Sequence, residues 1–320
     1  MTSWRGAMRL IVLSAVLGLG VLATTVVRLS RQHVDASDAP RVLGVSTAVV
    51  KHGAPIQHLP PTLLNDSRPN VQAKAVYLLD LDSAYPLYAQ NEQEPVPIAS
   101  VTKLMTAVIA RQQYQLDDIV TVSKTAATIN GSLIQLRTNE QLTVQSLLTG
   151  LLIQSGNDAA MALAEHTGYE QFIASMNEQA TTLGMKDTVF KDPAGLNDEG
   201  RSTARDLAIL ASYVLRDTVI RDIVDTPVTT VQSIDGTLSH ELTSSNRLIK
   251  SDHPLYMREV TGLKTGFTPD AGHCLVASAT YQGKELVSVV LHTNASTTEA
   301  SAVETKKLFL WAFSTFEWSK

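Results

Sequence analysis

Strand-like sequence occurs near both ends of the chain and helix-like sequence occupies the middle, and this order restricts the folds available to it. Residues 75–81 read as a buried strand, and residues 86–89 as the partner strand of a hairpin. Residues 274–281 and 285–292 are two further β-rich runs, joined by the hairpin signal Gln282-Gly283-Lys284. Because the two pairs of strands are far apart in sequence, a single sheet has to be assembled from both ends of the folded region.

The middle of the chain has the apolar spacing of helices. One helix is predicted from Ser100 to about Gln113, and three or four more from Thr143, about 157–166, 169–183 and 203–215. The Thr143 hydroxyl is expected to cap the first helix of that group. A closing helix at about 298–316 is expected to cover the sheet with Val303, Leu308, Leu310, Trp311 and Phe313.

These elements predict a mixed α/β (α+β) fold, in which an antiparallel sheet is flanked by helices and carries an inserted helical subdomain. We expect one domain at 71–320, with an α/β part from about 71–98 and 245–320 and a helical part from about 99–244. A cleft where the two parts meet is the expected place for an active site. Residues 31–70 contain several prolines and no sustained apolar period, so they are predicted to be a linker.

The N-terminal segment has the pattern of an export signal. Arg5 and Arg9 precede an apolar run from Leu10 to Val27 that only small residues interrupt. Cleavage after Ala23 fits a signal peptide within residues 1–30, whereas an apolar run of about 18 residues also fits a membrane anchor. The sequence therefore predicts export, to the periplasm or the outer face of the cytoplasmic membrane. In the anchored case this segment makes the contact with the inner membrane.

Charge and cysteine content exclude other classes of protein. The formal net charge is −5 and no basic stripe occurs, so no nucleic-acid partner is predicted. Cys274 is the only cysteine, which rules out an intramolecular disulfide and a cysteine-based zinc site. No His-x-x-Glu-His or similar metal spacing occurs, so we predict neither a metal nor a cofactor.

Three short motifs occur in order along the chain: Ser100-Val101-Thr102-Lys103, Ser155-Gly156-Asn157 and Lys264-Thr265-Gly266. A spacing of three on a helix places Ser100 and Lys103 on the same face, within side-chain reach. A serine hydroxyl becomes a nucleophile when a base takes its proton. Lysine can be that base where burial or another cation disfavours its charged form. By itself, the first motif also fits a serine that caps a helix and a lysine that points to solvent.

The other two motifs offer partners for this pair. Ser155 is a candidate to relay a proton to a leaving amine, and Asn157 to hydrogen-bond Lys103 and a substrate amide. Asn157 also fits a plain helix cap, because it lies at the junction of two apolar helices. Lys264 would supply the second cation if its strand folds over the Ser100 helix.

The strand that contains the third motif is a candidate wall of the cleft. Lys264 and Thr265 are predicted to bind a terminal carboxylate, and Gly266 to let the backbone approach a substrate closely. The Phe267 N–H could pair with that of Ser100 as an oxyanion hole. Thr268 completes the predicted substrate-binding run, although a strand that merely contains Lys-Thr-Gly is the plain alternative.

Taken together, the three motifs resemble those of the low-molecular-mass penicillin-binding proteins, the D-alanyl-D-alanine carboxypeptidase and endopeptidase family. The resemblance extends from about Ala75 to Ala312, and further matches lie at 97–106, 151–160, 183–185, 192–196 and 202–207. It implies a β-lactamase/transpeptidase-like fold with Ser100 as the acylated nucleophile. The implied substrates are peptidoglycan stem peptides, and β-lactam antibiotics are the implied acylating inhibitors.

The sequence resembles two different branches of the family in different motifs. Residues 264–268 and 271–276 are similar to the compact endopeptidase branch, and the chain ends soon after the closing helix, as that branch does. Ser155-Gly156-Asn157 is nearer the carboxypeptidase form of the second motif. Ser245 stands where some members carry an arginine before Asn246, and Arg247 follows two residues later. Carboxypeptidase and endopeptidase activities therefore both stay open.

Two alternative functions compete with a D,D-peptidase. A β-lactamase shares the acylation machinery, but the Glu-x-x-Leu-Asn element of class A enzymes is not found where it should be. A non-catalytic peptidoglycan-binding scaffold would keep the fold, and the three intact motifs argue against it. His166 and His273 are expected to be core histidines rather than members of a triad, and Cys274 a buried, inert thiol.

Overall fold

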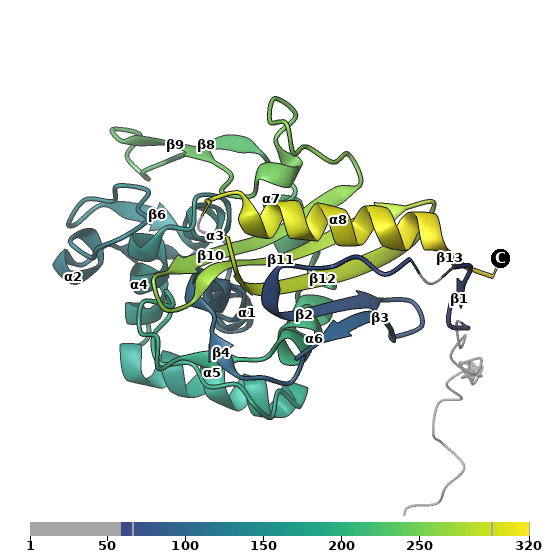
Figure 1. Ribbon diagram of the computed structural model, residues 1–320. Coiled ribbons are helices and arrows are strands. Elements are labelled where there is room, and N and C mark those ends of the chain that lie inside the picture. Colours follow the sequence, from purple (N-terminus) through teal and green to yellow (C-terminus); the bar gives the residue numbers. More distant parts are fainter. Residues whose placement is uncertain (1–58, 66, 296, 320) are drawn as a thin grey trace, which may run out of the picture. The chain divides into compact units, whose positions relative to one another are not determined.

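A five-stranded antiparallel sheet combines segments from both ends of the described chain (Figure 1). The computed structural model describes residues 59–65, 67–295 and 297–319, all within the unit Pro55–Lys320. The strands follow the order β10 (Val260–Thr268), β11 (Gly272–Tyr281), β12 (Lys284–Thr293), β2 (Ala73–Asp80) and β3 (Tyr85–Gln90). The predicted antiparallel sheet within a mixed α/β fold is thus confirmed, and β12 joins the two predicted hairpins.

Both faces of the sheet are buried, because successive side chains of a strand point to opposite sides. On β12, Val287, Val289 and Leu291 belong to the core shared with the helical part of the chain. Leu286 and Val290 belong to a second core on the other face. The sheet therefore lies between two layers of helices, which Figure 1 shows on either side of it.

The closing helix, α8 (Ala300–Thr315), covers the second face. Leu308 and Trp311 are buried against the sheet, as predicted, and Phe313 packs at the margin of this core. Val303 and Leu310 were also expected there, but they are 40% and 53% exposed. Leu310 is two positions from Leu308, which is about 200° around a helix, so the two leucines cannot face the same side.

The helical part contains the elements that the apolar spacing predicts. The helix expected at Ser100 begins as a 3-10 turn, η1 (Ala99–Thr102), and continues as α1 (Lys103–Gln113). Four helices occur between residues 143 and 215: α3 (Val144–Ile153), α4 (Asn157–Glu165), α5 (Tyr169–Leu183) and α6 (Ala204–Val214). The Thr143 hydroxyl caps α3 by accepting the Ser146 N–H at 3.1 Å, as predicted.

Residues 96–244 also contain strands and short helices that the sequence patterns do not predict. The strands form three small antiparallel pairs: β4 (Val96–Pro97) with β7 (Arg201–Ser202), β5 (Ile119–Thr121) with β6 (Gln141–Thr143), and β8 (Val228–Gln232) with β9 (Ser239–Thr243). The short helices are α2 (Lys124–Ala127) and α7 (Thr218–Val224). On β9 the buried His240 ring contacts Glu140 at 2.6 Å, which ties this hairpin to the loop before β6.

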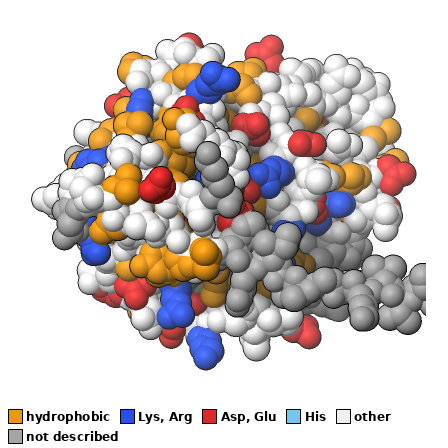
Figure 2. All heavy atoms as spheres, turned by 90° about the vertical axis from the view of Figure 1, so that its right-hand side faces the viewer, with side chains coloured by type: hydrophobic (Ala, Val, Ile, Leu, Met, Phe, Trp, Pro, Cys, Tyr) orange, Lys and Arg blue, Asp and Glu red, His pale blue; other side chains and the backbone are white. Residues whose placement is uncertain are grey.

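The described end of the predicted linker contacts the last residues of the fold. β1 (Thr62–Leu63) pairs with β13 (Phe316–Glu317), and the Leu64 N–H donates to the Thr315 carbonyl at 2.8 Å. Figure 2 looks onto the side that lies to the right in Figure 1, where hydrophobic and charged side chains are interspersed. The predicted export segment lies outside the described residues, and no helix within them is long and apolar enough to cross a membrane. The proposed domain boundaries stay a prediction.

Candidate active site

Ser100 lies where the sheet meets the helical part. The chain leaves β4 and turns at Ala99, whose φ of +48° is in the left-handed region, before η1 continues directly into α1. Edge strand β10 packs against η1. Ser100 lines a pocket of about 470 Å³ together with Ser155, Thr265, Gly266 and Phe267, so the structure brings residues of all three motifs to one cavity.

The Lys103 side chain is completely buried beneath Ser100. Its Nζ is 2.8 Å from the Ser100 Oγ, 2.7 Å from the Asn157 Oδ1 and 2.7 Å from the Ala194 carbonyl oxygen. Asn157 is held in this orientation because its Nδ2 donates to the Asn130 carbonyl at 2.6 Å. The alternative in which Lys103 points to solvent is therefore wrong, and Asn157 serves Lys103 rather than capping a helix.

Burial favours the neutral form of the Lys103 amine. Desolvation lowers its pKa from 10.5 to about 7, although the carboxylates of Asp192 and Asp158 act in the opposite direction. A neutral amine has two N–H groups and one lone pair. The two N–H groups match the Asn157 and Ala194 acceptors, which leaves the lone pair for the Ser100 hydroxyl proton. The same geometry therefore holds the amine and aims its lone pair at Ser100.

Lys264 is a second fully buried lysine near this pair. Burial lowers its pKa well below 10.5, and the proximity of Lys103 lowers it further. Its Nζ donates to the Thr265 carbonyl at 2.9 Å. Thr265 lines the pocket, whereas Lys264 lies behind the wall. The structure thus places Lys264 near Lys103, although burial and not Lys264 accounts for the lowered pKa of Lys103, and Thr265 is the member of the predicted carboxylate site that lines the pocket.

Ser155 stands in the short link between α3 and α4. It lines the pocket, is 5% exposed and has a φ of +68°, which is the left-handed region. Such a conformation costs about 1–3 kcal/mol in a non-glycine residue, so surrounding contacts have to hold it. Within the described residues the Ser155 hydroxyl makes no hydrogen bond, which leaves it free to contact a bound molecule.

Gly266 allows β10 to approach the turn that carries the nucleophile. A Cβ at this position would lie 2.8 Å from the Ile98 carbonyl oxygen and 3.2 Å from the Val101 nitrogen. Gly195 approaches the same turn from the other side, where a Cβ would lie 1.9 Å from the Ala99 carbonyl oxygen. Gly266 therefore has a close partner within the protein and also lines the pocket, and its role in substrate approach stays a prediction.

Asp192 was missed as a contributor to the site. Its carboxylate accepts the N–H groups of Ala194 at 2.7 Å, Gly195 at 2.6 Å and Asn197 at 2.7 Å, and so closes a tight turn. This turn aims the Ala194 carbonyl at Lys103. An Asp followed by Pro193 and Gly195 is a turn signal in the sequence, but the signal does not reveal which side chain the carbonyl meets.

Of the last two residues of the predicted substrate-binding run, Phe267 lines the pocket and Thr268 does not. The Phe267 ring is 56% exposed and stacks on His273 with ring centroids 4.4 Å apart, and both residues line the cavity. Thr268 instead closes the β10–β11 turn, because its Oγ1 donates to Asp198 at 2.6 Å and accepts the Ala271 N–H at 3.0 Å. Cys274 is buried, which raises the pKa of its thiol to about 12, so its expected inertness has a physical cause.

Ser245 connects the third motif to the neighbouring 3-10 helix, η2 (Arg247–Ile249). The Ser245 and Thr265 hydroxyls are 2.6 Å apart. Arg247 also lines the pocket and donates to the Thr298 carbonyl at 2.7 Å and to the Thr298 Oγ1 at 2.9 Å. Within the described part of the chain, no group of three or more His, Cys, Asp or Glu residues is arranged to hold a metal ion.

A serine nucleophile with a buried lysine, in a cleft between a sheet and a helical part, points to the class of lysine-assisted serine peptidases. The sequence pattern of the D-alanyl-D-alanine carboxypeptidase family matches residues 63–295. The chain belongs to this family, and the predicted resemblance is confirmed.

Characterised relatives bear both activities in their names. D-alanyl-D-alanine carboxypeptidases DacF of Bacillus subtilis and DacC of Escherichia coli are 35% and 37% identical to this chain over 77% and 78% of its length. The chain spans 63% of the length of each of these two relatives. The D-alanyl-D-alanine endopeptidase of Escherichia coli is 33% identical over 70% of this chain and 73% of its own. The names of these relatives therefore do not distinguish carboxypeptidase from endopeptidase activity for this chain.

A solved structure shows the same fold. The crystal structure of the Streptomyces K15 DD-transpeptidase matches with a TM-score of 0.72 at 29% identity. The match covers 78% of this chain and 100% of that one. The predicted transpeptidase-like fold is therefore confirmed.

Proposed function

We propose that this protein is a serine-type D-alanyl-D-alanine peptidase that acts on peptidoglycan stem peptides through an acyl-enzyme on Ser100. The observation that carries the proposal is the buried Lys103 amine, 2.8 Å from the Ser100 Oγ and fixed by two further acceptors. A general base has to be neutral and within reach of the proton that it takes, and the buried Lys103 amine meets both requirements at the Ser100 hydroxyl.

Each step of the proposed reaction can be assigned to an atom. The Ser100 Oγ attacks the carbonyl carbon of the D-alanyl bond while its proton passes to the neutral Lys103 Nζ. The carbon–nitrogen bond then breaks, and the leaving amine takes up a proton, for which the Ser155 hydroxyl is a relay. Water attacks the resulting ester, the new carboxylic acid leaves, and Ser100 regains its proton.

The pocket wall supports binding of an extended peptide. β10 is an edge strand among the described elements, with β11 on one side and the pocket on the other. An unpaired strand edge can add a peptide as a further strand. In that position the Thr265 hydroxyl would meet the carboxylate of the leaving residue, and the Ser100 and Phe267 N–H groups would hold the oxyanion.

The setting of the reaction follows from the same proposal. Cell wall peptides lie outside the cytoplasmic membrane, which agrees with export through residues 1–30 to the periplasm or the outer face of that membrane. A β-lactam antibiotic would acylate Ser100 as the peptide does. Carboxypeptidase action on free peptide ends and endopeptidase action on crosslinks use the same chemistry and differ in the leaving group.

A digest of purified peptidoglycan fragments, followed by mass spectrometry, tests the proposal. The protein should remove terminal D-alanine from pentapeptides or convert crosslinked dimers to monomers, and Ser100→Ala should do neither. Penicillin should label the protein covalently but not the Ser100→Ala variant. Absence of both cleavage and labelling would favour a non-catalytic scaffold, and rapid turnover of nitrocefin would favour a β-lactamase.

A further inference from the structure

The active-site pocket continues past the third motif to a second end. From Thr265 its wall passes through Ser245 to Arg247 and Lys250, which follow one another around η2. This end is also lined by the start of α8, at Thr298, Ser301 and Ala302, which Arg247 contacts through Thr298. The proposed reaction at Ser100 uses none of these last five residues.

This end of the pocket is positively charged. Arg247 and Lys250 both line it, and none of the described residues that line the pocket is an aspartate or a glutamate. Lys250 has no ion pair or hydrogen bond from its Nζ to another described residue. Arg247 is held in place by Thr298 and keeps N–H groups beyond the two bonds that it donates there.

The start of α8 adds uncharged donors. Ser301 is 5% exposed, lines the pocket, and its hydroxyl has no hydrogen-bond partner among the described residues. The first N–H groups of a helix have no partner within the helix, and α8 has no side-chain cap at this end. A helix terminus of this kind favours an anion, here in a cavity that also contains two cations and a free hydroxyl.

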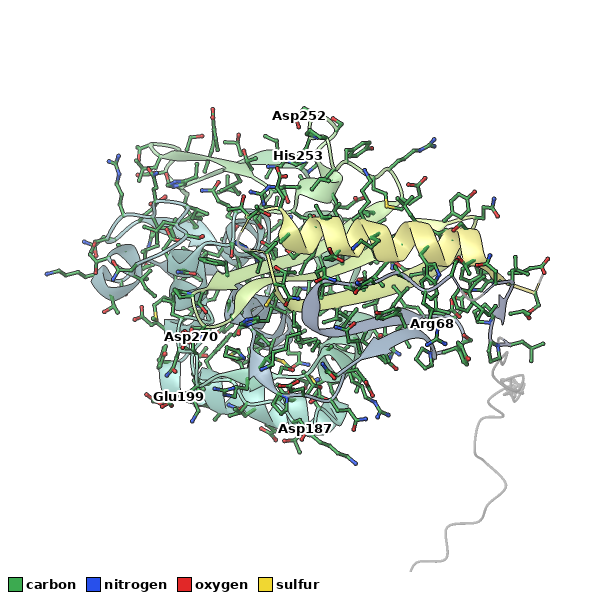
Figure 3. The ribbon with its side chains drawn as sticks, in the orientation of Figure 1. Arg68, Asp187, Glu199, Asp252, His253 and Asp270 are labelled. Carbon is green, nitrogen blue, oxygen red and sulfur yellow. The ribbon has the colours of Figure 1, made fainter. Side chains whose placement is uncertain are left out.

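The nearby acidic groups are directed elsewhere. Glu299, the residue before α8, pairs with His253 at 3.3 Å, and neither of them lines the pocket. Figure 3 shows Asp252 at the outer tip of the loop after η2, with His253 beneath it, toward α8. The positive charge of the cavity is therefore not neutralised from inside.

We propose that this end of the pocket is an anion subsite that binds a carboxylate of the leaving peptide, beyond the one that Thr265 meets. The inference rests on the proposed function, which places the carboxylate of the leaving residue at Thr265. The Thr265 hydroxyl is bonded to Ser245, whereas the Arg247 guanidinium is bonded to Thr298 at the start of α8, so we assign an anion held by Arg247 and Lys250 to a leaving group larger than one amino acid. Free D-alanine has one carboxylate, whereas a stem peptide released from a crosslink carries others. The subsite therefore favours crosslink cleavage.

Two substitutions test the subsite, each measured on three substrates. Lys250→Gln removes a charge with no hydrogen bond to lose, and Arg247→Gln removes the charge bonded to Thr298. Arg216→Gln, at an exposed arginine between α6 and α7, is the matched control. The substrates are a crosslinked dimer, the same dimer with the carboxylates of its leaving peptide amidated, and a monomeric pentapeptide.

We expect each subsite variant to lower kcat/KM on the free-acid dimer about tenfold, mainly through KM, because each loses one charge-assisted contact. Amidation of the leaving peptide should lower kcat/KM of the wild-type protein by a similar factor. It should lower kcat/KM of the two subsite variants little further, because they have already lost the contact. For Lys250→Gln, Arg247→Gln and Arg216→Gln, the rates of pentapeptide cleavage and of acylation by penicillin should stay within about twofold of the wild-type values.

The outcomes separate this inference from the proposed function. If penicillin acylates the protein but the subsite variants match Arg216→Gln on every substrate, the subsite is wrong and the peptidase stands. An equal loss on the dimer and the pentapeptide, or cleavage of pentapeptides alone, also overturns the subsite. If penicillin does not acylate the wild-type protein, the proposed function fails and the subsite with it.

Discussion

At the scale of single residues, the Lys103 amine joins the nucleophile to the rest of the site. Three oxygens surround its Nζ within 2.8 Å, from Ser100, Asn157 and the Ala194 backbone. Burial removes the water that would otherwise stabilise the ammonium form. In the proposed mechanism, protonation of this one atom decides whether Ser100 can react.

The pKa of Lys103 predicts how acylation depends on pH. Below about pH 7 the amine is protonated and cannot accept the Ser100 proton, so the rate should fall as pH decreases through that value. Above it the amine is neutral and the rate should reach a plateau. Stopped-flow acylation by a chromogenic β-lactam, between about pH 5 and 9, measures the profile. A rate independent of pH in this range would contradict Lys103 as the base.

Asn157→Asp should shift that profile. A carboxylate in place of the Asn157 amide would lie about 2.7 Å from the Lys103 Nζ and stabilise its charged form. The midpoint of the pH profile should therefore rise by about 1 to 3 pH units, and acylation at neutral pH should fall. Asn139→Asp, at an exposed position, is the control and should leave the midpoint unchanged. An unshifted midpoint in Asn157→Asp would separate Asn157 from the base.

The sequence allowed some of these contacts to be predicted and not others. The proximity of Ser100 and Lys103 could be predicted because a spacing of three on a helix places both side chains on one face. Asn157 lies on a different helix, α4, and was assigned to this pair through its motif. The Ala194 carbonyl was not predicted, because a backbone oxygen has no signature of its own in a sequence. The burial of Lys264 behind the pocket wall was also unforeseen, since both orientations fit the same strand.

At the scale of secondary structure elements, the distance between β10 and η1 controls the site. Gly266 is the point of closest approach, with the Ile98 carbonyl and the Val101 nitrogen opposite it. A longer residue there has no room unless one of the two elements moves. The geometry of Ser100 relative to Thr265 and Phe267 thus depends on a residue that has no side chain.

Gly266→Ala should separate β10 from η1. We expect a stability loss of about 1–3 kcal/mol from overpacking and a fall in the acylation rate of about 100-fold from misplacement of the reacting groups. Chemical denaturation and penicillin labelling measure the two effects. Gly283→Ala, at a turn glycine with φ +77° and open space, is the control. It should lower stability through backbone strain and leave the acylation rate unchanged.

Two leucines on α8 test how the helix packs. Leu308→Ala should lower the free energy of unfolding by about 2–5 kcal/mol, because Leu308 is fully buried in the core on the second face of the sheet. Leu310→Ala, on the exposed side of the same helix, should stay within about 0.5 kcal/mol of the wild-type value. Equal losses in urea unfolding would show that both leucines pack on the sheet, as the sequence analysis expected.

Long elements were predicted and short ones were not. The helices α3 to α6 and the strands β11 and β12 show a full apolar period, so their positions follow from the sequence. β4 and β7 have two residues each, too few for alternation to be seen. Such pairs form because tertiary packing brings the segments together.

At the scale of the whole described unit, the sheet and the helical part share a core. Val287, Val289 and Leu291 of β12 belong to the same buried cluster as the apolar residues of α1, α3, α4 and α6. An ion pair between Arg221 and Glu285 also links α7 to β12. The two parts therefore stabilise one another, and the cleft between them depends on both.

Residues 99–244, produced alone, should not fold. This fragment would expose the face that β12 covers, so we expect circular dichroism without a cooperative thermal transition. Residues 59–320 should unfold in one transition under the same conditions. A cooperative transition in the fragment would show instead that the helical part is an independent domain.

The pairing of β2 with β12 has a consequence for how the chain is made. Val76 faces Val290 in the sheet, so β2 cannot pair with β12 until all the residues between them have been synthesised. Contacts between residues so distant in sequence form late and slowly. Until β12 is made, β2 lacks this partner, and unpaired strands of this kind can still be threaded through a secretion channel.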